Sequence, residues 1–406
     1  MREEARTERG DREDALFVTL QPASLITPPQ HRPDDAFRLA VGSFVEDYPN
    51  RVDILRLVEE EVEAEADPDA RGGGAQATTT HRLRPDPALG FAHPYPPSRI
   101  AFCPDQSAAA PDLVATSGDF LRIWQVGSGG GSGGGGAGDD AARPASTRLA
   151  RLLTNAAHSA YCAPLTALDW NAADTRRLGT ASIDTTCTVW DVEVGVADAQ
   201  LVAHDGPVHD LAWGGVGVFA SASADGSVRV FDLRDREHST IIYEAPGPGR
   251  TALLRLAWNR ADPRYLATLA AGSGAVALLD IRLPTLPVAS LARHTAPATA
   301  LAWAPHSAAH MCTAGDDGQA LIWDLGGLGG GGGNGGPGGS GSGGGGGGGD
   351  AGGGGGGGTD PSPPGAGLDP VLAYSAGAPV AGLAWSAAAP DWVAVAFGRT
   401  AQVLRV

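Results

Sequence analysis

The sequence contains no lysine, so all 29 basic residues are arginine. This absence excludes phosphate-loop enzymes, protein kinases and enzymes that form a Schiff base through lysine. Long apolar runs are also missing, and the N-terminal residues MREEARTERGDRED have no apolar segment typical of a signal peptide. We therefore expect a soluble intracellular protein without a membrane-spanning segment.

Cysteine is scarce. The four cysteines Cys103, Cys162, Cys187 and Cys312 are far apart and form no CxxC pair. This spacing indicates neither a disulfide framework nor a sequence-local zinc site, and we expect no metal and no cofactor. The net charge of −17 comes without any basic run. Nucleic-acid phosphates would repel such a chain, so direct DNA or RNA binding is not expected.

Glycine is abundant but unevenly distributed. Of the 60 glycines, 37 lie in residues 127–138 and 326–367. The rest of the chain has an ordinary glycine content, close to about 7%. We expect two disordered glycine-rich loops, 127–147 and 326–367, inserted into one folded domain. A third insertion, the acidic loop 59–90, contains seven acids and no base at its start and is expected to be solvated and disordered.

A repeat dominates the remaining sequence. Strand-like segments that end in Leu-Ala-Trp or Leu-Asp-Trp recur with tryptophans at Trp170, Trp213, Trp258, Trp303 and Trp385. The spacings are 43, 45, 45 and 82 residues, and the last interval contains the second glycine tract. Without that tract the period is about 40–45 residues, the length of a four-stranded propeller blade.

A second marker has the same period. Alternating segments such as TVWDV, RVFDL and LIWDL follow polar turns of the Asp-Gly type, which is a β-hairpin pattern. The two markers predict an all-β, seven-bladed WD-repeat β-propeller over 15–406, after a disordered segment 1–14. The first blade would use strands at 37–45 and 51–58. The segment ALFVTL (15–20) is either another strand of that blade or the strand that closes the ring against the last blade.

Polar residues recur with the blades. The sixth blade carries a histidine before its first strand, a threonine, a turn aspartate and a tryptophan, namely His294, Thr313, Asp317 and Trp323. The fourth blade repeats the pattern as His204, Ser221 and Asp225, with Phe231 at the tryptophan position, and the third offers Thr180, Asp184 and Trp190. A catalytic group occurs once, whereas a structural hydrogen-bond network repeats. We therefore interpret these residues as architectural and expect no enzyme.

Two arginines follow blade strands in the pattern Asp-x-Arg. They are Arg234 after Asp232 and Arg282 after Asp280. Each is either an exposed arginine paired with its neighbouring carboxylate or a docking contact for a partner, because arginine is enriched in the energetic centres of interfaces.

Several segments are more specific than a general WD repeat. They include HPYPPSRIAF (93–102), SIDTTCTVWDVE (182–193), QLVAHDGPVHDLAWG (200–214), SADGSVRVFDLRDREHSTIIYE (223–244) and WAPHSAAHMCTAGDDGQALIWDL (303–325). On these segments the chain resembles the Transparent Testa Glabra / Light-regulated WD family of plants and its animal counterpart among the cullin-associated WD factors. The family usually opens with a tryptophan-containing strand, whereas residues 1–36 contain no tryptophan.

The resemblance implies a scaffold. It implies partners among MYB and basic helix-loop-helix transcription factors and protein kinases, in developmental, pigment or circadian regulation, in the nucleus and cytoplasm. The alternative is a substrate receptor of a cullin-RING ubiquitin ligase. In that case the resemblance places contacts to a cullin-ligase adaptor at Asp232 with Arg234 and at Asp280 with Arg282, although Phe231 and Leu279 replace the tryptophan usual there.

Overall fold

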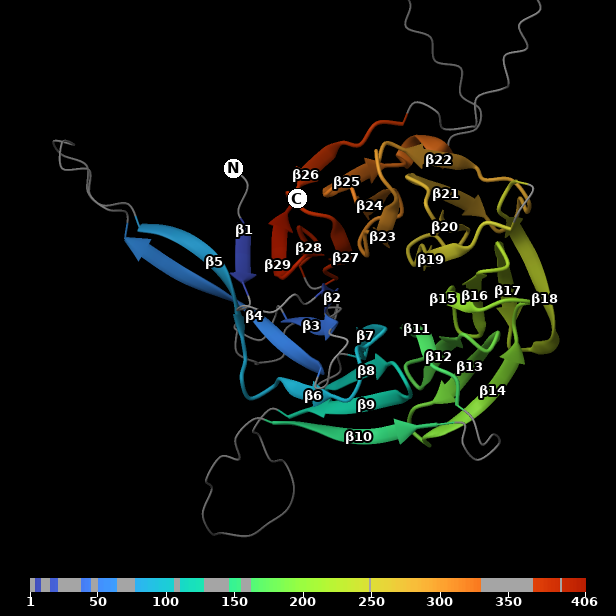
Figure 1. The fold of residues 1–406 in the computed structure, drawn as a ribbon, viewed down its shortest axis with the longest axis horizontal. Helices are drawn as coiled ribbons and strands as arrows, with labels where there is room; N and C mark the ends of the chain where they lie inside the picture. The colour runs from blue at the N-terminus through green and yellow to red at the C-terminus, as the bar shows by residue number, and fades with distance from the viewer. Residues whose placement is uncertain are drawn as a thin grey trace, which may run out of the picture.

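Seven antiparallel sheets form a ring in the computed structural model (Figure 1). The structure describes residues 4–8, 15–20, 38–44, 50–63, 77–105, 110–127, 146–154, 162–247, 250–329, 368–387 and 389–406. In this part of the chain the one helical element is a 3₁₀ turn at Gly326–Gly329. No helix among these residues has the length and apolar character needed to span a membrane. The predicted all-β, seven-bladed propeller is confirmed.

Each sheet is one blade, and its first strand lies at the centre of the ring. Blade 1 consists of β2 (Ala15–Leu20), β3 (Arg38–Phe44), β4 (Asn50–Glu63) and β5 (Ala77–Pro85), with β6 (Phe91–His93) paired to β4. Blade 2 consists of β7 (Arg99–Phe102), β8 (Leu113–Ser117), β9 (Leu121–Val126) and β10 (Thr147–Leu153). Blade 3 consists of β11 (Leu165–Trp170), β12 (Arg177–Ser182), β13 (Thr186–Asp191) and β14 (Val196–Val202).

The later blades follow the same order. Blade 4 consists of β15 (Val208–Trp213), β16 (Val218–Ser223), β17 (Ser227–Asp232) and β18 (Asp235–Glu244). Blade 5 consists of β19 (Leu253–Trp258), β20 (Tyr265–Ala270), β21 (Ala275–Asp280) and β22 (Ala289–Ala292). Blade 6 consists of β23 (Ala298–Trp303), β24 (His310–Gly315), β25 (Gln319–Asp324) and β26 (Leu372–Ser375). Blade 7 consists of β27 (Val380–Trp385), β28 (Trp392–Phe397), β29 (Thr400–Arg405) and β1 (Glu4–Glu8).

The N-terminus closes the ring. Strand β1 pairs antiparallel with β29, which puts the two ends of the chain in one sheet (Figure 1). The segment 1–14, predicted to be disordered, therefore contains a strand at Glu4–Glu8. Of the two roles left open for ALFVTL, the structure shows the first: the segment is β2 of blade 1, paired with β3. Closure in this way leaves the ring without an open gap between its first and last blades.

The acidic loop also differs from the expectation. Strand β4 runs on to Glu63 and pairs with β5 from Ala77, so part of the predicted loop 59–90 is a long hairpin that projects from the ring (Figure 1). Residues 64–76 lie outside the described part of the chain. So do 128–145 and 330–367, which hold most of the two glycine-rich loops predicted to be disordered.

The apolar core is divided among the blade interfaces. Each of seven buried clusters spans one pair of neighbouring blades. Between blades 3 and 4, for example, Val189 and Leu211 pack with Phe219. Every blade thus depends on both neighbours for its core, and the positions of the loops are fixed by the whole ring.

Side chains near the ring centre add hydrogen bonds between blades. The first strands of blades 3 to 7 each contain a β-bulge near their start. From the bulged position of blade 3, Thr166 Oγ1 donates to the Val208 carbonyl of blade 4 at 2.6 Å. In blade 4 the corresponding His209 Nδ1 lies 2.9 Å from the Leu253 carbonyl of blade 5. The bulges therefore position donors toward the next blade.

Candidate functional site

The four residues predicted in blade 6 lie in one hydrogen-bonded chain. Trp323 Nε1 donates to Thr313 Oγ1 at 2.9 Å, and Thr313 Oγ1 lies 2.8 Å from His294 Nε2. His294 Nδ1 is 3.1 Å from both carboxylate oxygens of Asp317. The Asp317 carboxylate also accepts the backbone N–H groups of Thr295 and Gln319, which fixes the turn between β24 and β25. The chain ties two strands of the blade, β24 and β25, to the turn between them and to the loop before β23.

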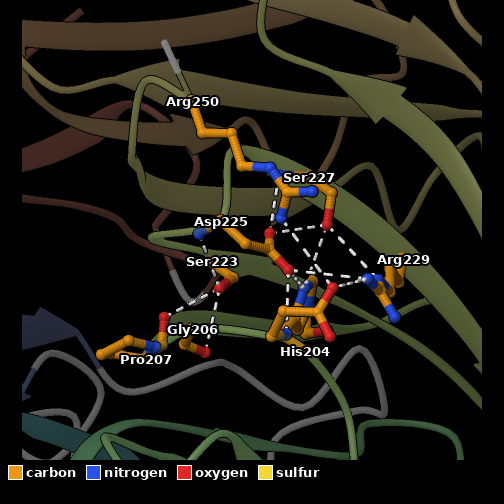
Figure 2. Close-up of polar contacts among 10 residues, drawn as sticks. His204, Gly206, Pro207, Ser223, Asp225, Ser227, Arg229 and Arg250 are labelled. Atoms are coloured by element: carbon orange, nitrogen blue, oxygen red, sulfur yellow. Dashed lines mark hydrogen bonds and ion pairs between the residues drawn. The ribbon is translucent and has the colours of Figure 1, made fainter.

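Blade 4 contains a related network (Figure 2). His204 Nδ1 lies 3.0 Å from Asp225 Oδ2, and His204 Nε2 lies 2.7 Å from Ser221 Oγ. Ser227 joins through its hydroxyl, which donates to Asp225 Oδ1 at 2.7 Å. Phe231, at the tryptophan position, has no N–H to donate and instead stacks on Phe219 with ring centroids 5.0 Å apart.

In blade 3 the structure brings only two of the three predicted residues into contact. Trp190 Nε1 donates to Thr180 Oγ1 at 2.8 Å. Asp184 instead accepts the backbone N–H and hydroxyl of Thr186, at 3.1 and 2.7 Å. Asp184 therefore fixes its turn, as Asp225 does in blade 4, and among the described residues it forms no hydrogen bond with Thr180 or Trp190.

Blade 2 carries a network that the sequence reasoning did not identify. His93 Nε2 lies 3.0 Å from Thr116 Oγ1, which accepts the indole N–H of Trp124 at 2.9 Å. His93 Nδ1 donates to the backbone carbonyl of Tyr95, which takes the place of a turn aspartate. The available signal was a histidine before the first strand and a Thr–Trp pair, although the pair is eight residues apart here and ten in blades 3 and 6.

Burial determines the electrostatics of these networks. The His294 and His204 side chains are 0% exposed, so they offer no reactive atom to a dissolved substrate. Burial lowers the pKa of His204 and of His93, because an apolar environment disfavours the charged imidazole. Burial opposes ionisation of Asp225 as well, but hydrogen bonds from Ser227 lower its pKa to about 2. The blade 4 pair is therefore a neutral imidazole beside a carboxylate.

Both Asp-x-Arg pairs are closed ion pairs at the ends of third strands. Arg234 Nε lies 2.9 Å from Asp232 Oδ1, and the Arg234 backbone N–H donates to the same oxygen at 3.0 Å. Arg282 Nε lies 2.9 Å from Asp280 Oδ1 in the same arrangement. The Arg234 side chain is 86% exposed and that of Arg282 is 55% exposed. Hydrogen bonds from Arg234 lower the pKa of Asp232 to about 2.

These arginines share a face with other exposed residues. First and third strands run in the same direction, so the loops that follow them lie on one face of the ring. We define the arginine face as the part of this surface over blades 3 to 5 that carries eight exposed or partly exposed residues: Arg176, Arg234, Arg264, Arg282, Val194, Val216, Leu283 and Leu286. Guanidinium groups held by carboxylates, interleaved with apolar side chains, form a surface suited to protein recognition.

Three of the four cysteines, Cys103, Cys187 and Cys312, are buried. Burial raises the pKa of the Cys103 thiol to about 11 and that of Cys187 to about 12, and it also raises the pKa of Cys312. Such thiols stay protonated and unreactive at neutral pH. No cluster of three or more histidine, cysteine, aspartate or glutamate residues suited to a metal ion occurs within the described ranges.

Comparison with known proteins points to one family. The family model described as WD domain, G-beta repeat matches residues 197–232 and 285–324. The DDB1- and CUL4-associated factor 7 homolog of Dictyostelium discoideum is 43% identical over 371 residues, which cover 91% of this chain and 92% of that protein. A WD repeat-containing protein of Saccharomyces cerevisiae is 36% identical over 57% of this chain and 48% of its own length. An uncharacterized WD repeat-containing protein of Schizosaccharomyces pombe is 32% identical over 71% and 64%.

Proposed function

Because the chain belongs to the WD-repeat family that includes the Dictyostelium DDB1- and CUL4-associated factor 7 homolog, we propose that it is a non-catalytic scaffold that assembles proteins into one complex. The observation that carries this proposal is the arginine face. Its guanidinium groups are already held by carboxylates, so little side-chain ordering remains to oppose binding. The buried histidine networks support it by keeping the blades, and hence this surface, in place.

The finer assignment concerns the partners. The plant-like segments of the sequence support MYB and basic helix-loop-helix transcription factors or protein kinases as the proteins held together, in the nucleus and cytoplasm. We propose this role in developmental, pigment or circadian regulation. Affinity purification of the full chain, followed by mass spectrometry, tests it. Recovery of a transcription factor of either class together with a second partner is expected, and reproducible absence of both classes and of kinases would contradict it.

The second candidate is a substrate receptor of a cullin-RING ligase. The name of the Dictyostelium relative states an association with DDB1 and CUL4, and two exposed Asp-x-Arg pairs of this chain lie on the arginine face. We propose that Arg234 and Arg282 contact the cullin-ligase adaptor. A planar guanidinium fixed by its aspartate keeps Nη1–H groups free of that carboxylate and directed toward a partner.

A double variant tests this candidate. Arg234→Ala with Arg282→Ala should weaken co-purification of the adaptor at least about tenfold, as expected if these arginines are energetic centres of the interface. Arg148→Ala is a matched control, because Arg148 is an exposed arginine on the outer strand β10 whose side chain contacts Gln125. If the double variant folds and binds the adaptor as the control does, Arg234 and Arg282 are not docking residues.

A further inference from the structure

The ring encloses a central cavity of about 330 Å³. Residues from the first strands of blades 2 to 7 line it, including the alternating charged groups Arg99, Asp210 and Arg255. A space of this volume holds a small molecule but not a folded segment of a partner. Ala300 and Gly382 line the same cavity from blades 6 and 7 and leave room opposite the charges.

Three charged residues occupy equivalent positions on three strands. Asp210 and Arg255 each follow the β-bulge of their strand, on β15 and β19, and Arg99 begins β7. Each stands three residues before the aromatic residue that ends its strand. The three side chains therefore lie at one level of the cavity, two guanidinium groups with one carboxylate.

That carboxylate is fully engaged without Arg255. Asp210 Oδ2 accepts Arg99 Nη2 at 2.6 Å and the Leu256 backbone N–H at 3.0 Å, while Oδ1 accepts the Leu211 N–H at 3.0 Å. Within the described residues, the hydrogen bond of Arg255 is to the Leu254 carbonyl, at 3.2 Å, and it forms no ion pair. The guanidinium of Arg255 thus lacks a carboxylate of its own.

Other charges near the cavity do not compensate for this one. Asp169 is paired with Arg260 at 3.1 Å closer to the tryptophan ends of the strands. Strand β2 is the first strand of the remaining blade, blade 1, and its sequence ALFVTL contains no ionisable residue. The positive charge of Arg99, together with burial, lowers the pKa of Arg255 to about 10. Among the described residues that line the cavity, one positive charge therefore remains in excess, in a protein whose net charge is −17.

We propose that the cavity is a binding site for a small phosphate-bearing molecule, whose phosphate lies between Arg99 and Arg255. Guanidinium groups match phosphate oxygens in planar, bidentate hydrogen bonds, and such bonds are strong where water is excluded. A phosphate at this level would give Arg255 the anionic partner it lacks and relieve its repulsion from Arg99. The site is independent of the arginine face and of any protein partner proposed above.

Calorimetric titration of the full chain with inorganic pyrophosphate tests the proposal. We expect one site per chain, and at least a tenfold loss of affinity in Arg255→Met, which keeps the side-chain length and removes the charge. The control is Arg148→Met, which should bind as the unaltered protein does. Equal binding by all three proteins, or no binding by any, would overturn the proposal.

Thermal unfolding in chloride buffer provides a readout that does not depend on the ligand. Arg255→Met should unfold at the same temperature as the unaltered protein or higher, because it removes a partly buried charge that has no ion-pair partner among the described residues. A marked loss of stability would show that Arg255 has a structural role and would overturn the proposal.

A short glutamate peptide serves as the second probe in the calorimetric titration. If the peptide binds and pyrophosphate does not, the cavity takes carboxylate groups from a partner and the phosphate assignment is wrong.

Discussion

Blades 2, 4 and 6 of this ring have the same strand order as blades 5 and 7 but use different side-chain interactions. Blades 2, 4 and 6 each bury a histidine whose Nε2 is hydrogen-bonded to a serine or threonine hydroxyl on the second strand. These histidines are His93, His204 and His294. In blade 5 the equivalent Thr268 donates instead to the Arg255 carbonyl at 2.8 Å, and in blade 7 the position is Val395. Backbone topology alone therefore does not determine how a blade is held together.

The tryptophans at the ends of the first strands alternate as well. Trp213 and Trp303, of blades 4 and 6, donate to carbonyls of the preceding blade, at Asp169 and Ala257. Trp170 and Trp258, of blades 3 and 5, donate to carbonyls of their own loops, five residues ahead.

Two asparagine side chains link the same pairs of neighbouring blades. Asn171 Nδ2 donates from blade 3 to the Gly215 carbonyl of blade 4, and Asn259 Nδ2 donates from blade 5 to the Ala308 carbonyl of blade 6. At this face the ring is thus built from polar-linked blade pairs, 3 with 4 and 5 with 6. At this face the junction between blades 4 and 5 depends on packing instead, and its hydrogen bonds, from His209 and to Asp210, lie nearer the opposite ends of the strands. This difference can be tested.

The largest effect is expected at the packed junction. A Cβ atom on Gly214 would lie 2.3 Å from Cε2 of the buried Trp258, so Gly214→Ala forces the indole or the backbone to move. We expect a loss of about 3 kcal/mol in the free energy of unfolding, as for an overpacked core. The matched control is Gly215→Ala, where an added Cβ meets no atom within 4 Å. Urea unfolding measures both, and equal stability of the two variants would show that the junction is not tightly packed.

The second prediction compares an even with an odd blade. Thr313→Val leaves the buried His294 Nε2 and Trp323 Nε1 without their shared hydroxyl partner, so we expect a loss of about 2 kcal/mol. Thr268→Val removes one hydrogen bond to a backbone carbonyl and should cost about 1 kcal/mol. If thermal unfolding ranks the two variants equally or in the opposite order, the histidine network adds nothing to its blade.

The third prediction concerns pH. Burial lowers the pKa of His93 and His204 in the folded protein from the ordinary value of 6.5. Below about pH 6.5 the unfolded chain therefore binds more protons than the folded chain, and stability falls as the pH decreases toward the lowered pKa values. Well above that pH both states hold the two histidines neutral, so they no longer make the free energy of unfolding depend on pH.

Chemical unfolding at pH 7.5, 6.5 and 5.5 measures how steeply the free energy of unfolding changes with pH. The double variant His93→Gln with His204→Gln should be less stable at pH 7.5 but should lose less further stability on acidification than the unaltered protein. An identical slope in both proteins would mean that other groups control the acid sensitivity.

The sequence was sufficient for features that repeat. The tryptophan period predicted the blades, and the same spacing identified the residues that meet in the networks of blades 4 and 6. The network of blade 2 was missed because His93 is bonded to a backbone carbonyl, which leaves no aspartate in the pattern. Pairing of Arg99 with Asp210 was beyond sequence reasoning, since it joins blades 2 and 4 through residues 111 positions apart in the sequence.

Strands in the segments predicted to be disordered were missed for a different reason. The closing strand β1 has the sequence EARTE, and the extension of β4 is rich in glutamate, so neither shows the alternation of apolar and polar residues by which strands are recognised. Their pairing follows from the edges that the rest of the ring offers, at β29 and β5. Such strands are determined by tertiary context rather than by their own composition.

The smallest effect is expected at the turn between the second and third strands, where the residue in blade 3 differs from that in blades 4 and 6. In the latter, Gly226 and Gly318 follow the turn aspartate with φ of 80° and 71°, whereas Thr185 of blade 3 adopts φ of 73° at the corresponding place. A β-branched residue is strained in this left-handed region, so Thr185→Gly should stabilise the protein by about 1 kcal/mol despite the greater freedom of glycine in the unfolded chain. The reverse change, Gly226→Thr, should destabilise it by a comparable amount, because the added side chain would also face the Thr251 carbonyl at 3.0 Å. If urea unfolding shows Thr185→Gly to be destabilising, the Thr185 side chain makes a compensating contact that outweighs the strain.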